Sequence, residues 1–212
     1  MKLKDLERFE EIVIQCHDNP DADTIACGFG VYLYLKSKGK EARLVYGGQN
    51  VIRKSNLVMM VQELHIPLVH VDYLRKPELL VMVDCQYRSG NAAVFEADNI
   101  AVIDHHRISS ELPEMSAVNS KLGACSTLIW KMLKRENFNV QENRELSTAL
   151  YYGLYMDTGS FTEIVHPLDK DLRDEARFDQ KIMRKLRNAN MSLDELGIAG
   201  AALLNTDYLE EY

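Results

Sequence analysis

The sequence predicts an α/β protein: a doubly wound, mainly parallel five-stranded sheet flanked by helices, with a helical C-terminal extension. Five short runs rich in Val, Ile and Leu predict the strands, at residues 11–16, 42–46, 67–71, 79–84 and 99–104. Unbroken apolar runs of this length are typical of strands buried on both faces, as in a parallel sheet. Segments with helical spacing separate the first runs, which is the alternation of right-handed strand–helix–strand units.

Two helices are expected between the first three strands. Residues 23–38 place apolar side chains three and four positions apart, and Gly39 is the residue type that often follows a helix in a left-handed conformation. Residues 53–65 place four apolar side chains on one face of a second helix.

Helices are also expected in the remainder of the chain. Residues 123–136 and 141–156 are apolar enough for two largely buried helices. Residues 169–188 predict one highly charged helix, which is either a solvated face or a contact within a homodimer. Ser192 and Glu195 have the spacing of a capping box and predict a last short helix.

Composition restricts the function further. The chain has 212 residues, 46% of them hydrophobic, and a net charge of −7, which is enough for one generous domain or two small ones. An acidic chain is poorly suited to holding a long duplex, because phosphate neutralisation supplies most of that affinity. No apolar run approaches the roughly 18 residues of a membrane span, and the N-terminus has charges where a signal peptide needs an apolar core. Membrane association is therefore not expected.

The four cysteines indicate reduced, buried thiols in a cytoplasmic protein. They are far apart in the sequence, without a CxxC pair, and each lies in an apolar stretch: Cys16, Cys27, Cys85 and Cys125. This pattern excludes a disulfide scaffold and a four-cysteine zinc site.

Acidic and imidazole side chains follow three of the predicted strands and one predicted helix. Because ligands of open α/β sheets bind beyond the carboxyl ends of the strands, we expect these side chains to meet at one edge. They are His17, Asp21, Asp23, Asp84, Asp104, His105, His106 and Asp157. Singly, each has a structural alternative as a turn or capping residue, but their shared position favours a functional site. His65 and His70 are interpreted as structural, and His166 lies where the chain could approach the site.

These ligand types favour a pair of divalent cations. Carboxylates with a minority of imidazoles and no thiolates suit Mn²⁺ best, with Mg²⁺, Co²⁺ or Fe²⁺ as alternatives. So many carboxylates would repel one another without a cation, and they are too many for one tetrahedral ion. Two ions about 3.5–4 Å apart, bridged by one carboxylate, would stabilise the entering and leaving oxygens of phosphoryl transfer.

Four motifs, in order, resemble those of the DHH phosphoesterase superfamily, which includes RecJ exonucleases, family II inorganic pyrophosphatases and nanoRNase-type oligoribonucleases. The similarity extends over roughly residues 11–165. The motifs are His17-Asp-Asn-Pro-Asp21-Ala-Asp23, Asp84 after Val83, Asp104-His105-His106, and Asp157 before Thr158-Gly159. The Asn-Pro pair in the first motif is closer to the nanoRNase and RecJ branch than to the pyrophosphatases.

The resemblance implies a role for each motif residue. One Mn²⁺ would be held by His17 and Asp21. The other would be held by Asp23, His105 and Asp157, and Asp84 would bridge the two ions. Asp104 would orient the ring of His105 through its second nitrogen, and His106 would face the substrate phosphate. Residues 123–127 either resemble a segment of the oligoribonuclease branch or form an ordinary Ser/Thr-capped helix start.

The implied function is a manganese-dependent phosphoesterase. Its expected substrates are short oligonucleotides or small nucleotides, hydrolysed by a hydroxide that two cations activate. Two alternatives remain: an inorganic pyrophosphatase or polyphosphatase, and a non-catalytic module that binds metal and nucleotide.

The chain departs from this branch of the family after residue 190. Members of the branch have a smaller C-terminal domain with a glycine-rich basic segment, and nothing after Asn190 resembles it. Residues 1–190 are therefore expected to form the catalytic domain, and residues 191–212 a helical linker toward a substrate-binding domain absent from this chain.

Overall fold

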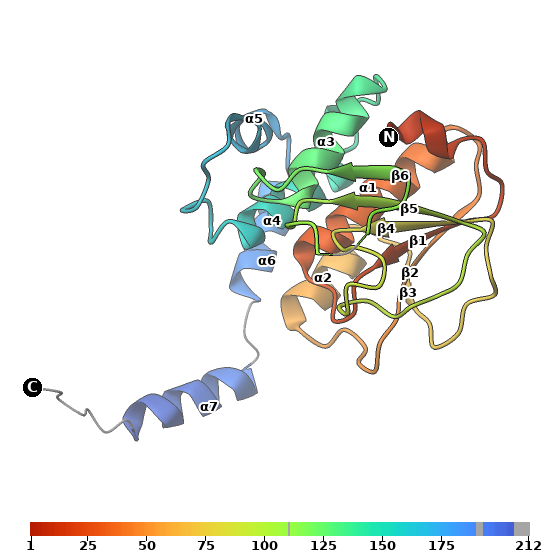
Figure 1. Ribbon diagram of the computed structural model, residues 1–212. Coiled ribbons are helices and arrows are strands. Elements are labelled where there is room, and N and C mark those ends of the chain that lie inside the picture. The colour runs from red at the N-terminus through yellow and green to blue at the C-terminus, as the bar shows by residue number, and fades with distance from the viewer. Residues whose placement is uncertain (110, 190–192, 206–212) are drawn as a thin grey trace, which may run out of the picture.

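A six-stranded parallel sheet forms the centre of the protein (Figure 1). The computed structural model describes residues 1–109, 111–189 and 193–205. The strands are β1 (Ile12–Cys16), β2 (Ala42–Tyr46), β3 (Leu68–His70), β4 (Leu79–Val83), β5 (Asn99–Asp104) and β6 (Met115–Val118). The predicted α/β class and parallel sheet are confirmed, with six strands rather than five. The sequence did not predict β6 because its four half-buried residues contain no β-branched run.

The strand order brings three segments with candidate site residues to the same edge of the sheet. It runs β3-β2-β1-β4-β5-β6, so the direction of winding reverses between β1 and β4. Cys16 pairs with Val83, and Val83 pairs with Ile103. The residues that follow these three positions therefore leave the carboxyl edge side by side, where doubly wound sheets bind ligands.

Helices account for most of the remaining chain. They are α1 (Ala22–Ser37), α2 (Ser55–Glu63), α3 (Cys125–Arg135), α4 (Arg144–Asp157), α5 (Pro167–Glu175), α6 (Gln180–Asn188) and α7 (Leu193–Leu204). Two 3₁₀ turns are added, η1 (Leu3–Leu6) and η2 (Val140–Glu142). Gly39 follows α1 with φ +73°, as its predicted position after the helix requires. The capping residue Ser192 lies outside the described residues.

The predicted charged helix over residues 169–188 is wrong in one respect, because the chain forms two helices there. Ala176 is extended, with ψ 128°, which ends α5. Asp179 then caps α6 by accepting hydrogen bonds from the amides of Lys181 and Ile182. The Asp179 side chain thus takes the amides that a continuous helix would have bonded internally.

The two faces of the sheet are covered differently. Ile14, Val81 and Ile103 belong to a large core that includes buried residues of α1 to α6, and α1 packs against both α3 and α4. Val13, Leu80 and Val102 point to the opposite face, where Leu74, Ala92 and other loop residues cover them. The residues that position the candidate site therefore come from the strand ends and from α1, α3 and α4.

Three further sequence expectations concern the cysteines, membrane-spanning helices and the domain boundary. All four cysteines are buried and free of disulfides, as predicted. Across the described ranges, no helix combines the length and the apolar character that crossing a bilayer requires. The boundary at residue 190 between a catalytic domain and a linker stays a prediction.

Candidate metal centre

His17 and Asp21 form the first part of the site, at the end of β1 and the start of α1. Asp21 is the N-cap of α1, and its Oδ1 accepts hydrogen bonds from the amides of Asp23 and Thr24, both 3.0 Å long. Its Oδ2 lies 3.6 Å from Nε2 of His17. The other ring nitrogen of His17, Nδ1, donates to the carbonyl of Asp18 at 2.8 Å. That bond directs Nε2 toward the carboxylates, an arrangement common in metal-binding histidines.

Asp23 is a buried carboxylate that caps a helix distant in the sequence. Its Oδ2 accepts from the amide of Cys125 at 2.6 Å, and its Oδ1 from the amide and the hydroxyl of Ser126. These are the first amides of α3, whose own N-cap residue, Ala124, offers no side-chain cap. The segment 123–127 therefore does begin a helix, but its cap comes from Asp23 of α1 and not from its own Ser or Thr.

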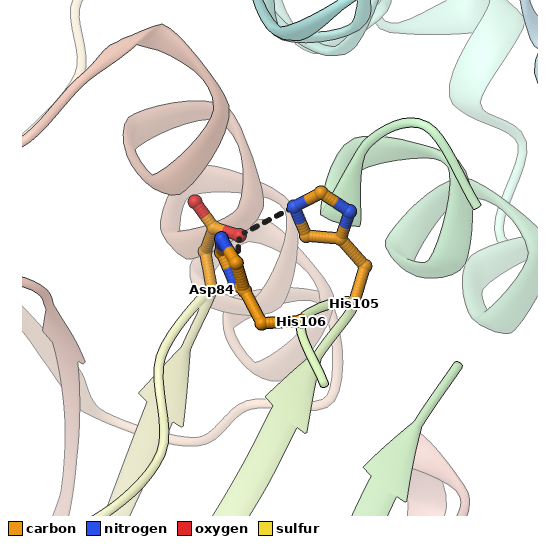
Figure 2. A group of neighbouring side chains, drawn as sticks. All are labelled: Asp84, His105 and His106. Atoms are coloured by element: carbon orange, nitrogen blue, oxygen red, sulfur yellow. Dashed lines mark ion pairs between the residues drawn. The ribbon is translucent and has the colours of Figure 1, made fainter. Parts of the chain in front are cut away.

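Asp84 lies at the centre of the site. It follows β4 with φ +59°, and its amide donates to the carbonyl of Ile103 at 2.8 Å. Its Oδ2 is 3.7 Å from Nε2 of His17, and its Oδ1 is 3.3 Å from Nε2 of His105. Figure 2 shows ion pairs from this carboxylate to both histidines of the Asp104-His105-His106 motif. Asp84 is thus within reach of both predicted metal positions.

Asp157 and His105 complete the far side. Asp157 is the last residue of α4, and its Oδ2 lies 3.3 Å from Nε2 of His105. Oδ2 of Asp23 is 4.0 Å from the same nitrogen. Nδ1 of His105 is 3.2 Å from the carbonyl oxygen of Leu122, which can only accept a hydrogen bond.

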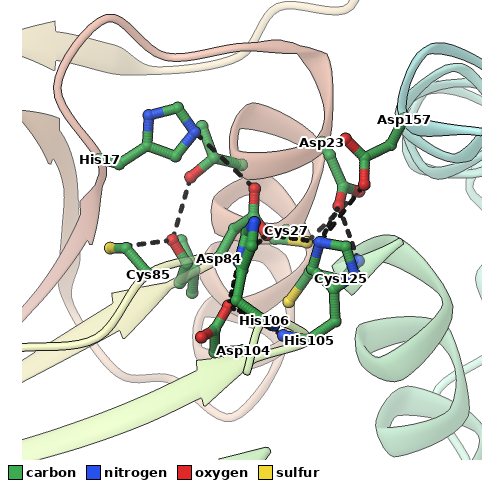
Figure 3. Close-up of polar contacts among 12 residues, drawn as sticks. His17, Asp23, Cys27, Asp84, Cys85, Asp104, His105, His106, Cys125 and Asp157 are labelled. Carbon is green, nitrogen blue, oxygen red and sulfur yellow. Dashed lines mark hydrogen bonds and ion pairs between the residues drawn. The ribbon is translucent and has the colours of Figure 1, made fainter. Parts of the chain in front are cut away.

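The expected contact between Asp104 and the ring of His105 is wrong. Oδ1 of Asp104 accepts from Nδ1 of His106 at 2.8 Å and from the backbone amides of both histidines. The chain turns immediately after β5, so the ring of His106 folds back over Asp104 while that of His105 points toward α3 and α4 (Figure 3). Asp104 therefore positions His106, and the Leu122 carbonyl takes the role expected of Asp104.

The candidate ligand atoms gather into overlapping groups. In each group, one ligand atom from every residue lies within 4.8 Å of the others. We call His17, Asp21 and Asp84 the first position, and Asp23, His105 and Asp157 the second position. A third group joins Asp84 to His105 and His106. All six predicted ligands thus converge, although their binding of metal stays a prediction.

The electrostatics of the site fit divalent cations. Burial, together with the charge of Asp23, raises the pKa of Asp84 well above its usual range. The same causes raise the pKa of Asp157 to about 7. Oδ1 of Asp84 and Nε2 of His105 are buried and lack a hydrogen-bond partner among the described residues. Two unpaired ligand atoms at the meeting point of the carboxylates are what a metal position would satisfy.

Several supporting residues were not predicted from the sequence. Gln86 donates to Oδ2 of Asp104 at 2.7 Å and accepts from the amide of Ser109. Gly153 brings α4 so close that a Cβ there would lie 2.4 Å from Oγ of Ser126. Asp169, fully buried, accepts from the amide of Gly123 just before α3. A polar residue two positions after Asp84 was the signal for Gln86, whereas the others depend on tertiary contacts.

The other histidines lie outside the ligand groups. His65 is exposed and contacts Glu145 at 2.9 Å, and His70 bonds the carbonyl of Gly48, so both have the structural roles expected. His166 caps α5 by accepting from the amide of Leu168.

One curated relative aligns with nearly all of the chain, and two others with more than two thirds of it. An uncharacterized protein of Methanocaldococcus jannaschii is 25% identical over 97% of this chain and 43% of its own length. The cyclic-di-AMP phosphodiesterase GdpP of Geobacillus thermodenitrificans is 26% identical over 72% of this chain and 25% of its own length. The bifunctional oligoribonuclease and PAP phosphatase NrnA of Thermus thermophilus is 27% identical over 71% of this chain and 44% of its own length. This chain therefore spans less than half the length of each of these relatives.

A solved structure has the same fold. The exopolyphosphatase-related protein from Bacteroides fragilis superposes with a TM-score of 0.74 at 20% identity. The match covers 97% of this chain and 64% of that one. The likeness shows the architecture alone.

The family assignment depends on the span that contains the site. The sequence model of the DHH family, N-terminal domain, matches residues 11–154. This range includes every candidate ligand except Asp157, which follows it by three residues on α4. Because the match takes in more than half of the chain and three of the four motifs, the chain belongs to the DHH family.

Proposed function

We propose that this chain is the catalytic part of a manganese-dependent phosphoesterase that hydrolyses short oligonucleotides or small nucleotides. The observation that carries the proposal is the convergence of six candidate ligands, with Asp84 at their centre and its Oδ1 buried without a hydrogen-bond partner among the described residues. His17 and Asp21 would hold one cation, Asp23, His105 and Asp157 the other, and Asp84 would bridge them. Two such cations would supply positive charge for the entering and leaving oxygens of a phosphate ester.

The chain's own residues would bind the ester and move a proton. The hydrogen bond to Asp104 raises the pKa of His106, which favours the imidazolium at neutral pH. The side chain of His106 is 55% exposed, and Nδ1 is occupied by Asp104, so Nε2 is the nitrogen available to substrate. When water attacks phosphorus and the ester P–O bond breaks, His106 would donate its proton to the leaving oxygen.

The donor set and the charge of the chain support the choice of metal and substrate. Carboxylate oxygens with two imidazoles and no thiolate suit Mn²⁺ better than a softer ion. The net charge of −7 disfavours long duplexes and leaves short or small substrates. One relative is a bifunctional oligoribonuclease and PAP phosphatase, and another is a cyclic-di-AMP phosphodiesterase.

The test is a substrate panel with the chain loaded with Mn²⁺. We expect mononucleotide or phosphate release from a linear dinucleotide, a nucleoside 3′,5′-bisphosphate or both. Preferential release of phosphate from pyrophosphate would instead favour the pyrophosphatase alternative. Tight nucleotide binding with no product from any substrate over hours would favour the non-catalytic alternative and contradict the proposal.

A further inference from the structure

α6 (Gln180–Asn188) is a basic helix in an acidic chain. It has four cationic side chains and no acidic one: Lys181, Arg184, Lys185 and Arg187. Met183 and Leu186 are buried beneath it, and all four cations are exposed. The neighbouring helix α5 shows the usual mixture of acidic and basic residues on a solvated surface. A surface of one sign, in a chain of net charge −7, indicates attraction to an anion.

Aromatic and cationic groups line a hollow on the same helix. A surface cavity of about 500 Å³ is lined by Phe178, Gln180, Met183, Arg184, Arg187 and Asn188. Phe178 stacks on Tyr151 with the ring centroids 3.9 Å apart, and the Arg187 guanidinium lies 5.3 Å from the centre of the Tyr155 ring. Lys185 is already paired with Glu63, but within the described part of the chain no ion pair joins Arg184 to a carboxylate. Arginines beside an aromatic shelf can bind both phosphates and bases.

The C-terminal end of α6 lies next to the candidate metal centre. The hydroxyl of Tyr152 donates to the Leu186 carbonyl of α6 and accepts from the amide of Asn56. Asn56 lines a second cavity, of about 300 Å³, whose wall also includes Lys54, Asp23 and Asp157. α6 packs against α2 and α4 (Figure 1), and each of these two helices contributes residues to the lining of this cavity. The C-terminal end of the basic helix therefore lies beside the metal-site cavity, and the rest of the helix leads away from it.

We infer that α6 and Phe178 bind single-stranded nucleic acid beyond the phosphate at the metal centre, with Lys54 contacting the strand at the cavity. The inference rests on the proposed function, because it takes the metal centre as the place of cleavage. A single strand is the partner favoured, since its bases are free to stack on Phe178 while its phosphates meet Arg184 and Arg187. The substrate class becomes oligonucleotides several nucleotides long, in preference to bisphosphates or pyrophosphate.

The experiment measures binding apart from hydrolysis. Fluorescein-labelled, phosphorothioate-linked oligonucleotides of two, four and eight nucleotides are titrated with the full chain and Mn²⁺, and fluorescence anisotropy is recorded. The test variant is K181E/R184E/R187E. The matched control, K36E/R43E/R75E, makes the same change of charge at exposed cations near the opposite edge of the sheet. Circular dichroism verifies that both variants fold.

We expect affinity to rise from two to eight nucleotides in the unmodified chain. The α6 variant should bind the octanucleotide about tenfold or more weakly, and its salt dependence should lose a slope of about 2, because three phosphate contacts each contribute about 0.7. The control variant should change the affinity less than twofold. A Phe178→Leu variant should lose about fivefold at every salt concentration, because stacking is not screened.

Four results would overturn the inference. They are equal losses in the α6 and control variants, an α6 variant that binds like the unmodified chain, no length dependence, and no binding at all. If the α6 variant bound phosphatidylglycerol vesicles more weakly than the unmodified chain but bound oligonucleotides equally well, α6 would be assigned to a membrane surface instead. Hydrolysis of unmodified dinucleotides is assayed separately. Binding that depends on α6 without hydrolysis would refute the proposed function alone, and hydrolysis with unchanged binding in the α6 variant would refute this inference alone.

Discussion

The first and second metal positions are built from different parts of the chain. The first, apart from Asp84, comes from one turn, because His17 and Asp21 are four residues apart and Asp21 caps α1. The second collects Asp23 from α1, His105 from the end of β5 and Asp157 from α4. The Asp21 side chain is 51% exposed, whereas that of Asp23 is 1% exposed. The first position is thus built mainly from one turn, and the second from three segments that are distant in the sequence.

The two positions also differ in the pKa values of their side chains in the absence of metal. Burial acts to raise the pKa of Asp21, but the hydrogen bond and charge of His17 outweigh it and lower that pKa. Burial acts to lower the pKa of His17, but Asp21 raises it in turn, which favours a carboxylate beside a protonated imidazole at the first position. In the second position burial dominates and raises the pKa of both Asp23 and Asp157, which favours the protonated form of each carboxyl group. A metal ion at the second position therefore competes with a proton on Asp157.

The largest effect is expected where the two positions meet. Asp84→Asn keeps the size of the side chain but removes the charge shared by both positions. Turnover should fall by about 10³-fold or more, the upper range for losing one group that stabilises charge in a transition state. Kinetic assays and elemental analysis of bound manganese would measure the change, with fewer than two ions expected per chain.

The matched control for this variant is Asp18→Asn. Asp18 lies next to His17 and accepts from the amide of Ala93, a bond that an asparagine oxygen can also accept. It belongs to none of the ligand groups. Equal activity losses in the two variants would show that the region tolerates no change at all, and would remove the special role of Asp84.

The second position should be the more sensitive to packing. In Gly153→Ala the new methyl group would lie 2.4 Å from Oγ of Ser126 and 3.0 Å from Oδ1 of Asp23. Either α4 or Asp23 must move, at a cost of about 1–3 kcal/mol in the free energy of unfolding. We expect the second ion to bind roughly a hundredfold more weakly, the upper range for disturbing the support of a ligand, while the first ion is affected less.

Calorimetric titration with Mn²⁺ would separate the two binding steps. Gly197→Ala is the control, because a Cβ at this position on α7 would have no atom of the described residues within 4 Å. Equal weakening of both ions in Gly153→Ala would argue against two independently built positions.

The fold was largely predictable because a strand that is buried on both faces can be recognised from its own short stretch of sequence. Continuous Val and Ile runs identified five strands, since a strand covered on both faces needs apolar residues at successive positions. β6 is an edge strand with four half-buried residues, and its pairing with β5 gives no such pattern. The break between α5 and α6 depends on Asp179 and on the stacking of Phe178 upon Tyr151, which is a tertiary contact.

The site was predictable in its members but not in its connections. Each candidate ligand follows a strand or ends a helix, so the topology of a parallel sheet was enough to bring them together. Which side chain orients which was not determined by spacing. The pairing of Asp104 with His106, and of His105 with the Leu122 carbonyl, depends on how the chain turns after β5. The capping of α3 by Asp23 joins residues 102 positions apart.

The affinity of the second position should depend on pH. Because the pKa of Asp157 is raised to about 7, its protonated form stabilises the metal-free fold below the unfolded pKa near 4, and this stability is lost as the pH rises through 7. Mn²⁺ competes with the same proton. Its affinity should therefore increase by up to about tenfold for each unit by which the pH rises toward 7. The thermal shift caused by Mn²⁺ should therefore be larger at pH 8 than at pH 6.

Differential scanning fluorimetry at the two pH values measures this, with Asp157→Asn as the comparison. That variant has no carboxyl group to titrate at residue 157, so its pH dependence should be shallower. A metal-induced shift that is the same at pH 6 and pH 8 in the unmodified chain would contradict the protonated second position.

The smallest effect is expected at Gln86, which serves neither metal position directly. Gln86 donates to Asp104 and to the carbonyl of Arg107, and accepts from the amide of Ser109, so it fixes both the partner of His106 and the loop after it. Gln86→Leu should lower kcat about tenfold through misplacement of His106. Binding of Mn²⁺ should change less than twofold, because neither the first nor the second position touches Gln86. Gln15→Leu removes another buried glutamine, whose amide bonds the Ala93 carbonyl, and provides the control. If Mn²⁺ affinity fell together with kcat in Gln86→Leu, Asp104 would have to support the metal ligands themselves, and its assignment to His106 alone would be wrong.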